Sequence, residues 1–126
     1  VADNFEWSRQ VSAAQAGAAH RFRLEFVDHF SAVLGNDGVL VMPTMPDVAP
    51  LRLASDSSLK EYQRRALRML CIASLAGAPQ LNLPIARRDG APMGLSLLGP
   101  AGSDHALIAA AQMLCMDRAA RPRENH

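Results

Sequence analysis

The first apolar pattern along the chain recurs every three or four residues between Ser8 and Leu34. Its positions form one helical face: Val11, Ala14, Ala18, Phe22, Phe26, Phe30 and Val33. This spacing predicts a long amphipathic helix. Gly35 and Asn36 follow directly, and both residue types accept the left-handed conformation found at helix C-termini, so we expect the helix to end there.

A short unbroken apolar run, Val39–Met42, comes next and stops at Pro43. Such a run is typical of a strand that is covered on both faces. Residues 44–58 then carry two prolines and a Ser-Asp-Ser-Ser cluster, a composition that predicts an irregular loop. Loops of this length are usually functional or mobile.

A second helix is predicted over about residues 59–75, with Ser57 or Ser58 as its N-cap and Gly77 after its end. Its apolar positions fall on one side: Tyr62, Ala66, Met69, Leu70 and Ala73. Basic side chains surround the other side: Lys60, Arg64, Arg65 and Arg68. We interpret these basic residues as a solvated face.

Two alternating runs around an Asp-Gly turn predict a β-hairpin, the first at Leu81 to Ile85 and the second at Met93 to Leu98. Proline and glycine interrupt both runs, although each weakens a strand ladder. A last helix is predicted after Ser103, its expected cap, with one apolar face: Leu107, Ala111, Leu114 and Cys115. Residues 119–126 are predicted to form a flexible tail.

The order of elements is helix, strand, loop, helix, hairpin, helix, which favours an α/β layer arrangement. No repeat or linker divides the 126 residues. Three short strands make a poor sheet by themselves, because strand edges need pairing or cover. The chain is therefore interpreted as part of a larger fold.

Composition narrows the class of protein. Hydrophobic residues make up 49% of the chain, and the formal net charge is +1. This charge predicts neither a nucleic acid nor a membrane partner, and no apolar run approaches the ~20 residues of a membrane-spanning helix. Cys71 and Cys115 fall in helical apolar patterns, so both are predicted to be buried free thiols in a reduced, cytoplasmic compartment.

Residue chemistry by itself suggests no reaction. Ser57 and Lys60 have the spacing of a Ser-Lys pair, but their place at a helix start favours a cap and an exposed lysine. The four histidines have no partner at a metal-ligand spacing, so no metal site is expected.

Three segments together resemble the C-terminal part of the amidase signature family. They are "GVLVMPTMPDVAP" from residue 38, "ASLAGAPQLNLPI" from residue 73 and "GAPMGLSLLGPAGSDHALIAAAQML" from residue 90. Their order and spacing match the family's strand ending in Pro-Thr, its helix ending at Gly-x-Pro and its hairpin with Pro-x-Gly-Leu. The stretch "EYQRRALRMLCIASLAG" from residue 61 is similar to the indole-3-acetamide hydrolase branch and to the amidase-like domain of a chloroplast envelope receptor.

The resemblance implies that residues 1–126 are the C-terminal portion of a single amidase domain, whose fold is a mixed β-sheet core covered by helices and is incomplete here. Family members hydrolyse a carboxylic amide to acid and ammonia through an acyl-enzyme, using a Ser nucleophile, a second Ser on a cis peptide bond and a Lys. Those motifs belong to the N-terminal portion of the domain and are absent from this chain. No metal or organic cofactor is implied.

By the same resemblance, this chain supplies scaffold and a wall of the substrate cleft. The expected lining residues are Thr44, Met45, Pro46, Leu70, Cys71, Ser74, Ala78 and Pro79. A wall of this composition suits an apolar or aromatic acyl group, for example an aryl or indole acetamide. The expected partners are the amide and the N-terminal catalytic portion, and a homodimer is allowed. The alternatives are a non-catalytic binding or receptor module and a small stand-alone protein.

Overall fold

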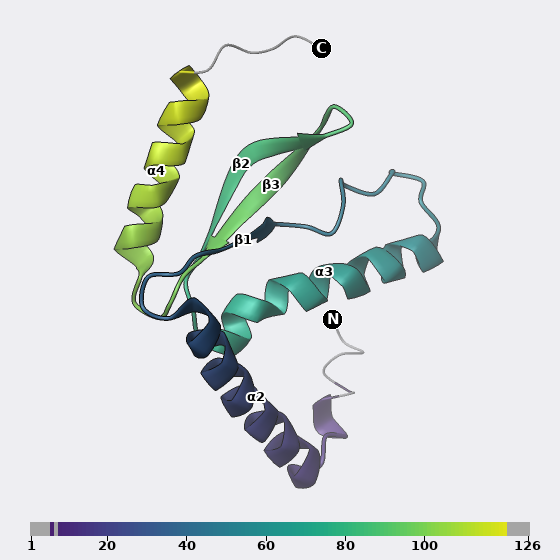
Figure 1. Ribbon diagram of the computed structural model, residues 1–126. Coiled ribbons are helices and arrows are strands. Elements are labelled where there is room, and N and C mark those ends of the chain that lie inside the picture. The colour runs from purple at the N-terminus through teal and green to yellow at the C-terminus, as the bar shows by residue number, and fades with distance from the viewer. Residues whose placement is uncertain (1–5, 7, 121–126) are drawn as a thin grey trace.

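A computed structural model of the chain describes residue 6 and residues 8–120 (Figure 1). Its elements follow the predicted order: α2 (Ala13–Leu34), β1 (Leu40–Pro43), α3 (Asp56–Ala76), β2 (Gln80–Arg88), β3 (Ala91–Leu98) and α4 (Asp104–Ala120). The α/β fold class is thereby confirmed. The predicted tail at 119–126 lies mostly outside the described residues, and its flexibility stays a prediction.

The strands form an antiparallel sheet in the order β1-β3-β2. Both neighbours pair with β3 at its end, where Leu40 and Gln80 lie opposite Leu98. The predicted hairpin is confirmed, and its turn has positive φ at both Asp89 and Gly90, as a tight two-residue turn requires. The ladder between β2 and β3 is interrupted by a bulge that follows Leu83.

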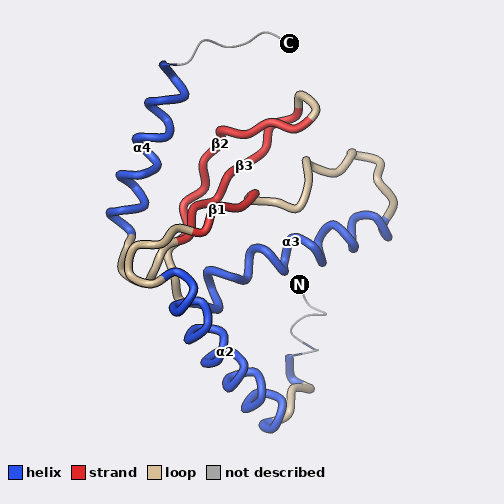
Figure 2. The backbone as a smooth tube through the Cα atoms, viewed as in Figure 1, coloured by secondary structure: helices blue, strands red, loops and turns tan. Residues whose placement is uncertain are grey.

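Helices cover both faces of the sheet, so the molecule has three layers (Figures 1 and 2). On one face, Leu107 and Ala111 of α4 pack against Leu83 and Leu97. The other face packs against α2 and α3, and its core joins three buried residues: Phe30, Ala73 and Leu98. The alternation of side chains along β3 sends Leu97 and Leu98 into different cores.

The prediction that the first strand is covered on both faces is wrong for this chain. β1 is an edge strand, and α4 packs against β2 and β3. The side chain of Val41 consequently remains 54% exposed. The apolar run correctly indicated a strand, but no element among the described residues packs against the second face of that strand.

Three predictions about caps and helix bounds need correction. The helix predicted from Ser8 begins at Ala13, because Ser12 and Gln15 form a reciprocal capping box. The N-cap of α3 is Ser55, whose hydroxyl accepts from the backbone N–H of Ser58 at 3.3 Å. The hydroxyl of Ser103 is buried without a hydrogen-bond partner among the described residues, so it does not cap α4.

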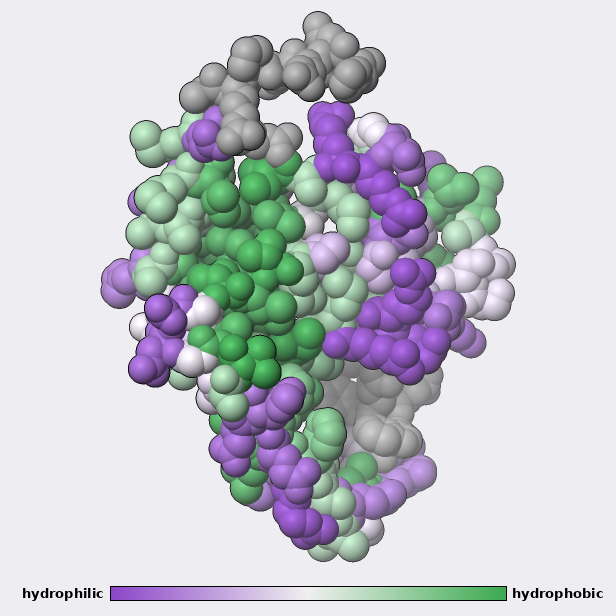
Figure 3. Space-filling view, viewed as in Figure 1, coloured by the Kyte–Doolittle hydropathy of each residue, from purple (hydrophilic) through white to green (hydrophobic). Residues whose placement is uncertain are grey.

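The two cysteines are also placed differently from the prediction. Cys71 and Cys115 are free thiols, but both are exposed. Each lies on a helix whose buried face is narrow: α3 buries Ala66 and Ala73, and α4 buries Leu107 and Ala111. Other apolar positions of these helices are exposed, among them Leu67 and Leu70 of α3 and Ile108 and Met113 of α4. Figure 3 shows apolar side chains gathered over α4 and the neighbouring strands.

The solvent-accessible surface of the chain is large for its mass. It measures 9860 Å² for 13.6 kDa, whereas a compact monomer of this mass exposes roughly 6,600 Å². Large hydrophobic residues contribute to this surface, and Leu51, Leu53 and Leu67 are among the exposed ones. Such a surface is typical of a segment that packs against further protein.

Candidate functional site

The predicted site begins where β1 ends. The backbone N–H of Thr44 donates to Gly94 O at 2.9 Å, so the chain still follows β3 at this point. Thr44, Met45 and Pro46 are all half-buried. The loop that they open, residues 44–55, then runs along the sheet and α3 to the start of that helix (Figure 2).

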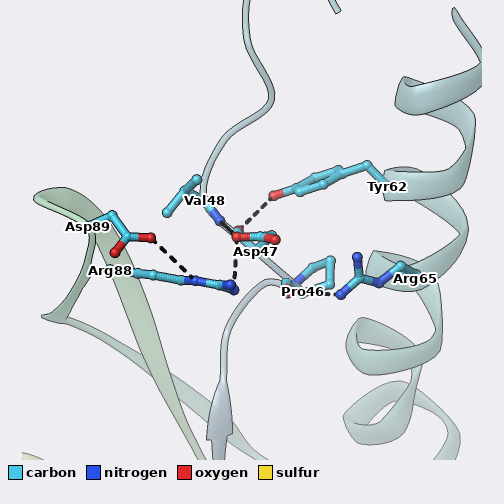
Figure 4. Close-up of polar contacts among 7 residues, drawn as sticks. All are labelled: Pro46, Asp47, Val48, Tyr62, Arg65, Arg88 and Asp89. Atoms are coloured by element: carbon cyan, nitrogen blue, oxygen red, sulfur yellow. Dashed lines mark hydrogen bonds and ion pairs between the residues drawn. The ribbon is translucent and has the colours of Figure 1, made fainter. Parts of the chain in front are cut away.

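The loop is fixed to α3 by two side chains that bind its backbone (Figure 4). Tyr62 Oη donates to Asp47 O at 3.2 Å, and Arg65 Nη2 donates to Pro46 O at 3.3 Å. Two side chains of α3 thus provide hydrogen-bond donors for two backbone carbonyls of the loop. The sequence predicted Arg65 as part of a solvated face, and backbone acceptors leave no residue pattern that would have revealed this contact.

Asp47 joins the loop to the hairpin. Its carboxylate accepts from the N–H of Val48 at 2.8 Å and lies 3.1 Å from Arg88 Nη1. Arg88 also lies 3.8 Å from the Asp89 carboxylate. In Figure 4, Asp47 sits between Tyr62 of α3 and Arg88 at the end of β2. The loop is therefore held from both sides, although exposed ion pairs add little to stability.

An open cavity of about 570 Å³ lies between this loop and the first turns of α3. Its walls are Asp47, Val48, Pro50, Ser57, Ser58, Glu61, Tyr62 and Arg65. None of the predicted lining residues belongs to it. The sequence predicts Tyr62 on the apolar side of the helix and Arg65 on its solvated face, and it places the other positions in the loop or at the helix start. Only the folding of the loop onto the helix forms the cavity.

Glu61 is the charged group of this cavity with a perturbed pKa. Two hydrogen bonds from Arg64, at 2.8 and 2.9 Å, stabilise its carboxylate and lower the pKa from its ordinary 4.5. The charges of Arg65 and Arg68 act in the same direction more weakly. The same pair raises the pKa of Arg64. Glu61 is therefore an ionised partner of arginine and a poor general base.

The predicted residues of the second helix form an exposed stripe on α3. Leu70, Cys71 and Ser74 are exposed and lie beside Leu67, which is 60% exposed. This stripe is displaced around the helix from the buried residues Ala66 and Ala73. It is a second apolar face, available to contact more protein or a ligand.

Ala78 and Pro79 lie at the other end of α3, where Gly77 adopts the left-handed conformation. Both are half-buried. Ala78 packs on the core around Phe30, and Pro79 O accepts from Gly99 N at 3.3 Å. The predicted residues thus occupy three places: the loop start, the exposed stripe of α3 and the base of the sheet.

Catalytic chemistry is sparse in the part of the chain that the structure describes. Ser57 Oγ lies 3.0 Å from Ser55 Oγ, and no contact with Lys60 is formed there. Across residue 6 and residues 8–120, no three His, Cys, Asp or Glu side chains gather where they could hold a metal ion. The helices in this region are all too short or too polar to span a bilayer.

Solved structures establish the class of fold. The chain superposes on a glutamyl-tRNA(Gln) amidotransferase subunit of Thermotoga maritima with a TM-score of 0.69 and 22% identity, covering 86% of this chain and 24% of that one. A crystal structure of an amidase gives a TM-score of 0.70 at 23% identity, covering 85% and 26% of the two chains. The architecture is that of a segment of an amidase signature enzyme.

Sequence comparison assigns the family. The Amidase family model matches residues 4–108, so the chain belongs to this family. It is 35% identical over 86 residues to Amidase 1 of Oryza sativa subsp. japonica, covering 68% of this chain and 20% of that protein. It is 34% identical over 83 residues to the chloroplastic outer envelope protein 64 of Arabidopsis thaliana, covering 66% and 14%. The chain thus spans a fifth or less of these two relatives.

Proposed function

We propose that the chain is the C-terminal portion of an amidase that hydrolyses a carboxylic amide to acid and ammonia through an acyl-enzyme. Family membership is the observation that carries this proposal. The Ser nucleophile, the cis-peptide Ser and the Lys would belong to an N-terminal portion, and this chain would supply scaffold and cleft wall. The large exposed apolar surface supports a role next to further protein.

The proposed cleft wall is the exposed stripe of α3 together with the loop start and the end of α3. Leu70, Cys71 and Ser74 would face the N-terminal portion across the cleft. Thr44, Met45 and Pro46 would lie at one end of the wall, and Ala78 and Pro79 at the other. Apolar walls favour an apolar or aromatic acyl group, and the similarity of residues 61–77 to the indole-3-acetamide hydrolase branch supports an aryl or indole acetamide. We further propose that the protein works in the cytoplasm and allow for a homodimer.

The cleft wall is tested in a chimera in which this chain replaces the corresponding segment of rice Amidase 1. Leu70→Trp should shift the ratio of kcat/KM for phenylacetamide to that for acetamide by about tenfold, because pockets discriminate by the space they leave. Met45→Trp should act similarly. Leu53→Trp is the matched control, since Leu53 is 93% exposed and outside the proposed wall. An unchanged ratio in both test variants would remove these residues from the cleft.

A second candidate function is a binding module without catalysis. The observation in its favour is the 34% identity with outer envelope protein 64, nearly equal to the identity with rice Amidase 1. Both functions would use the same exposed stripe. They differ in ammonia release, which a binding module would lack even when it retains affinity for its ligand.

A further inference from the structure

The strand ladder determines which backbone groups of β1 point away from the sheet. Thr44 N donates to Gly94 O at 2.9 Å, so these two residues form a hydrogen-bonded pair. Hydrogen-bonded and non-hydrogen-bonded pairs alternate along an antiparallel ladder, and the register between β1 and β3 is continuous. Met42 therefore bonds to β3, whereas the backbone groups of Val41 and Pro43 point toward the free edge of β1.

The free edge of β1 is apolar and exposed. Val41 is 54% exposed and presents both its N–H and its C=O at this edge. Its side chain lies on the face toward α4, because it stands opposite Leu97. Val39 and Leu40 are exposed beside it. Among the described residues, no strand pairs with β1 on this side (Figure 2).

The opposite edge of the sheet, formed by β2, has features that keep a strand edge from pairing. A bulge follows Leu83, and Pro84 within it has no N–H to offer a further strand. Two charged residues, Arg87 and Arg88, end the strand. Bulges, prolines and charges are the means by which natural sheets protect their edges. β1 has no charge and no bulge, and its one proline is its last residue.

We propose that the free edge of β1 pairs with a strand of the N-terminal portion, with Val41 at the centre of the new ladder. An open edge is a template for another strand, since its outward N–H and C=O groups match those of the added backbone. The added strand would carry an apolar side chain next to Val41 on the α4 face. This chain covers only 24% and 26% of the two solved chains of the same fold. The choice of an N-terminal portion as the occupant rests on the proposed function.

The test is hydrogen exchange of the backbone amides, resolved to single residues, in the 126-residue chain and in the rice Amidase 1 chimera. In the chain alone, the Val41 N–H should exchange nearly as fast as in an unstructured peptide. The Met42 N–H is the internal control and should be protected in both proteins, because it bonds to β3. In the chimera, the Val41 N–H should exchange roughly 100-fold more slowly than in the chain alone, because it is then part of a ladder.

Three variants of the chimera identify the edge as the cause of this protection. Val41→Lys places a charge where natural edges carry one to prevent pairing, and it should reduce the protection of the amide at position 41 at least tenfold. Val41→Thr keeps a β-branched strand former and should retain the protection. Leu53→Lys is the matched control, since Leu53 is 93% exposed and outside β1. A dispersed NMR spectrum of each variant of the 126-residue chain shows that the substitution itself permits folding.

Equal exchange of the Val41 N–H in the chain and in the chimera would overturn the proposal. Protection in the isolated chain that grows with its concentration would also overturn it, because a second copy would then occupy the edge. The same holds for a chimera that aggregates unless Val41 is replaced by lysine, since its edge would be unpaired. Ammonia release is measured separately. Protection of Val41 without ammonia release would refute the proposed function and leave this edge standing, and release without protection would do the reverse.

Discussion

At the scale of single residues, the polar cluster around Ser96 links positions that are far apart in the sequence. Asn82 and Ser96 come from β2 and β3 and Thr44 directly follows β1, and the buried hydroxyl of Ser96 lies within hydrogen-bond distance of both other side chains. Such a cluster is stabilising only when its members stay together, because each buried polar group that loses a partner costs free energy. Residues that position the cluster should therefore matter beyond their own contacts.

Gly94→Ala tests the position of Thr44. A Cβ at Gly94 would lie 2.5 Å from Thr44 Oγ1 and 2.8 Å from Thr44 Cβ. Overpacking of this kind should lower the free energy of unfolding by about 1–3 kcal/mol, measured by urea denaturation. Gly17→Ala is the control, because the nearest atom is Arg21 Nη1 at 3.8 Å and alanine in a helix interior stabilises by roughly 0.5–1 kcal/mol. Equal midpoints for Gly94→Ala and the unmodified chain would contradict the packing.

The pKa of Glu61 gives a second residue-scale prediction. Because hydrogen bonds from Arg64 lower this pKa in the folded state, Glu61 stabilises the fold above its ordinary 4.5, and that contribution is lost as the pH falls through the lowered value. Arg64→Gln should raise the pKa in a ¹³C NMR titration of the carboxyl. Arg68→Gln should raise it less, since Arg68 acts only through its charge. A larger effect of Arg68→Gln would contradict the assigned pairing.

At the scale of elements, the sequence correctly predicted those elements whose packing partners lie within this chain. The hairpin followed from alternating residues and an Asp-Gly turn, because both its faces are packed in the same chain. The predictions that the first strand is covered on both faces and that Cys71 is buried were wrong. An apolar position indicates that a residue tends to be buried, but it does not show which part of the protein would cover it. The contacts of Tyr62 and Arg65 with loop carbonyls were missed because backbone acceptors are the same at every residue.

The start of α3 can be tested with two neighbouring serines. Ser55 is the N-cap and accepts from Ser58 N, whereas Ser57 is inside the helix. Ser55→Ala should therefore lower the free energy of unfolding by about 1 kcal/mol. Ser57→Ala is the matched control and should change it by a few tenths at most, because alanine suits a helix interior. Thermal unfolding of both variants decides which serine is the cap.

At the scale of the whole molecule, the chain has the fold of a segment of an amidase signature enzyme and a large exposed surface for its mass. It exposes 9860 Å² and matches about a quarter of each solved amidase-type chain. The proposed cleft wall contains no nucleophile or general base, so we do not expect it to hydrolyse an amide by itself. We propose that the activity belongs to this chain in combination with an N-terminal portion, and that the exposed stripe of α3 faces that portion.

Ammonia release from phenylacetamide tests this account most directly, with the 126-residue chain alone and the rice Amidase 1 chimera measured side by side. We predict no release by the chain alone and release by the chimera. Release by the isolated chain that is abolished by Ser57→Ala would contradict the account, because the nucleophile would then lie in this chain. A folded chimera without activity would contradict it too, and would favour a non-catalytic binding module.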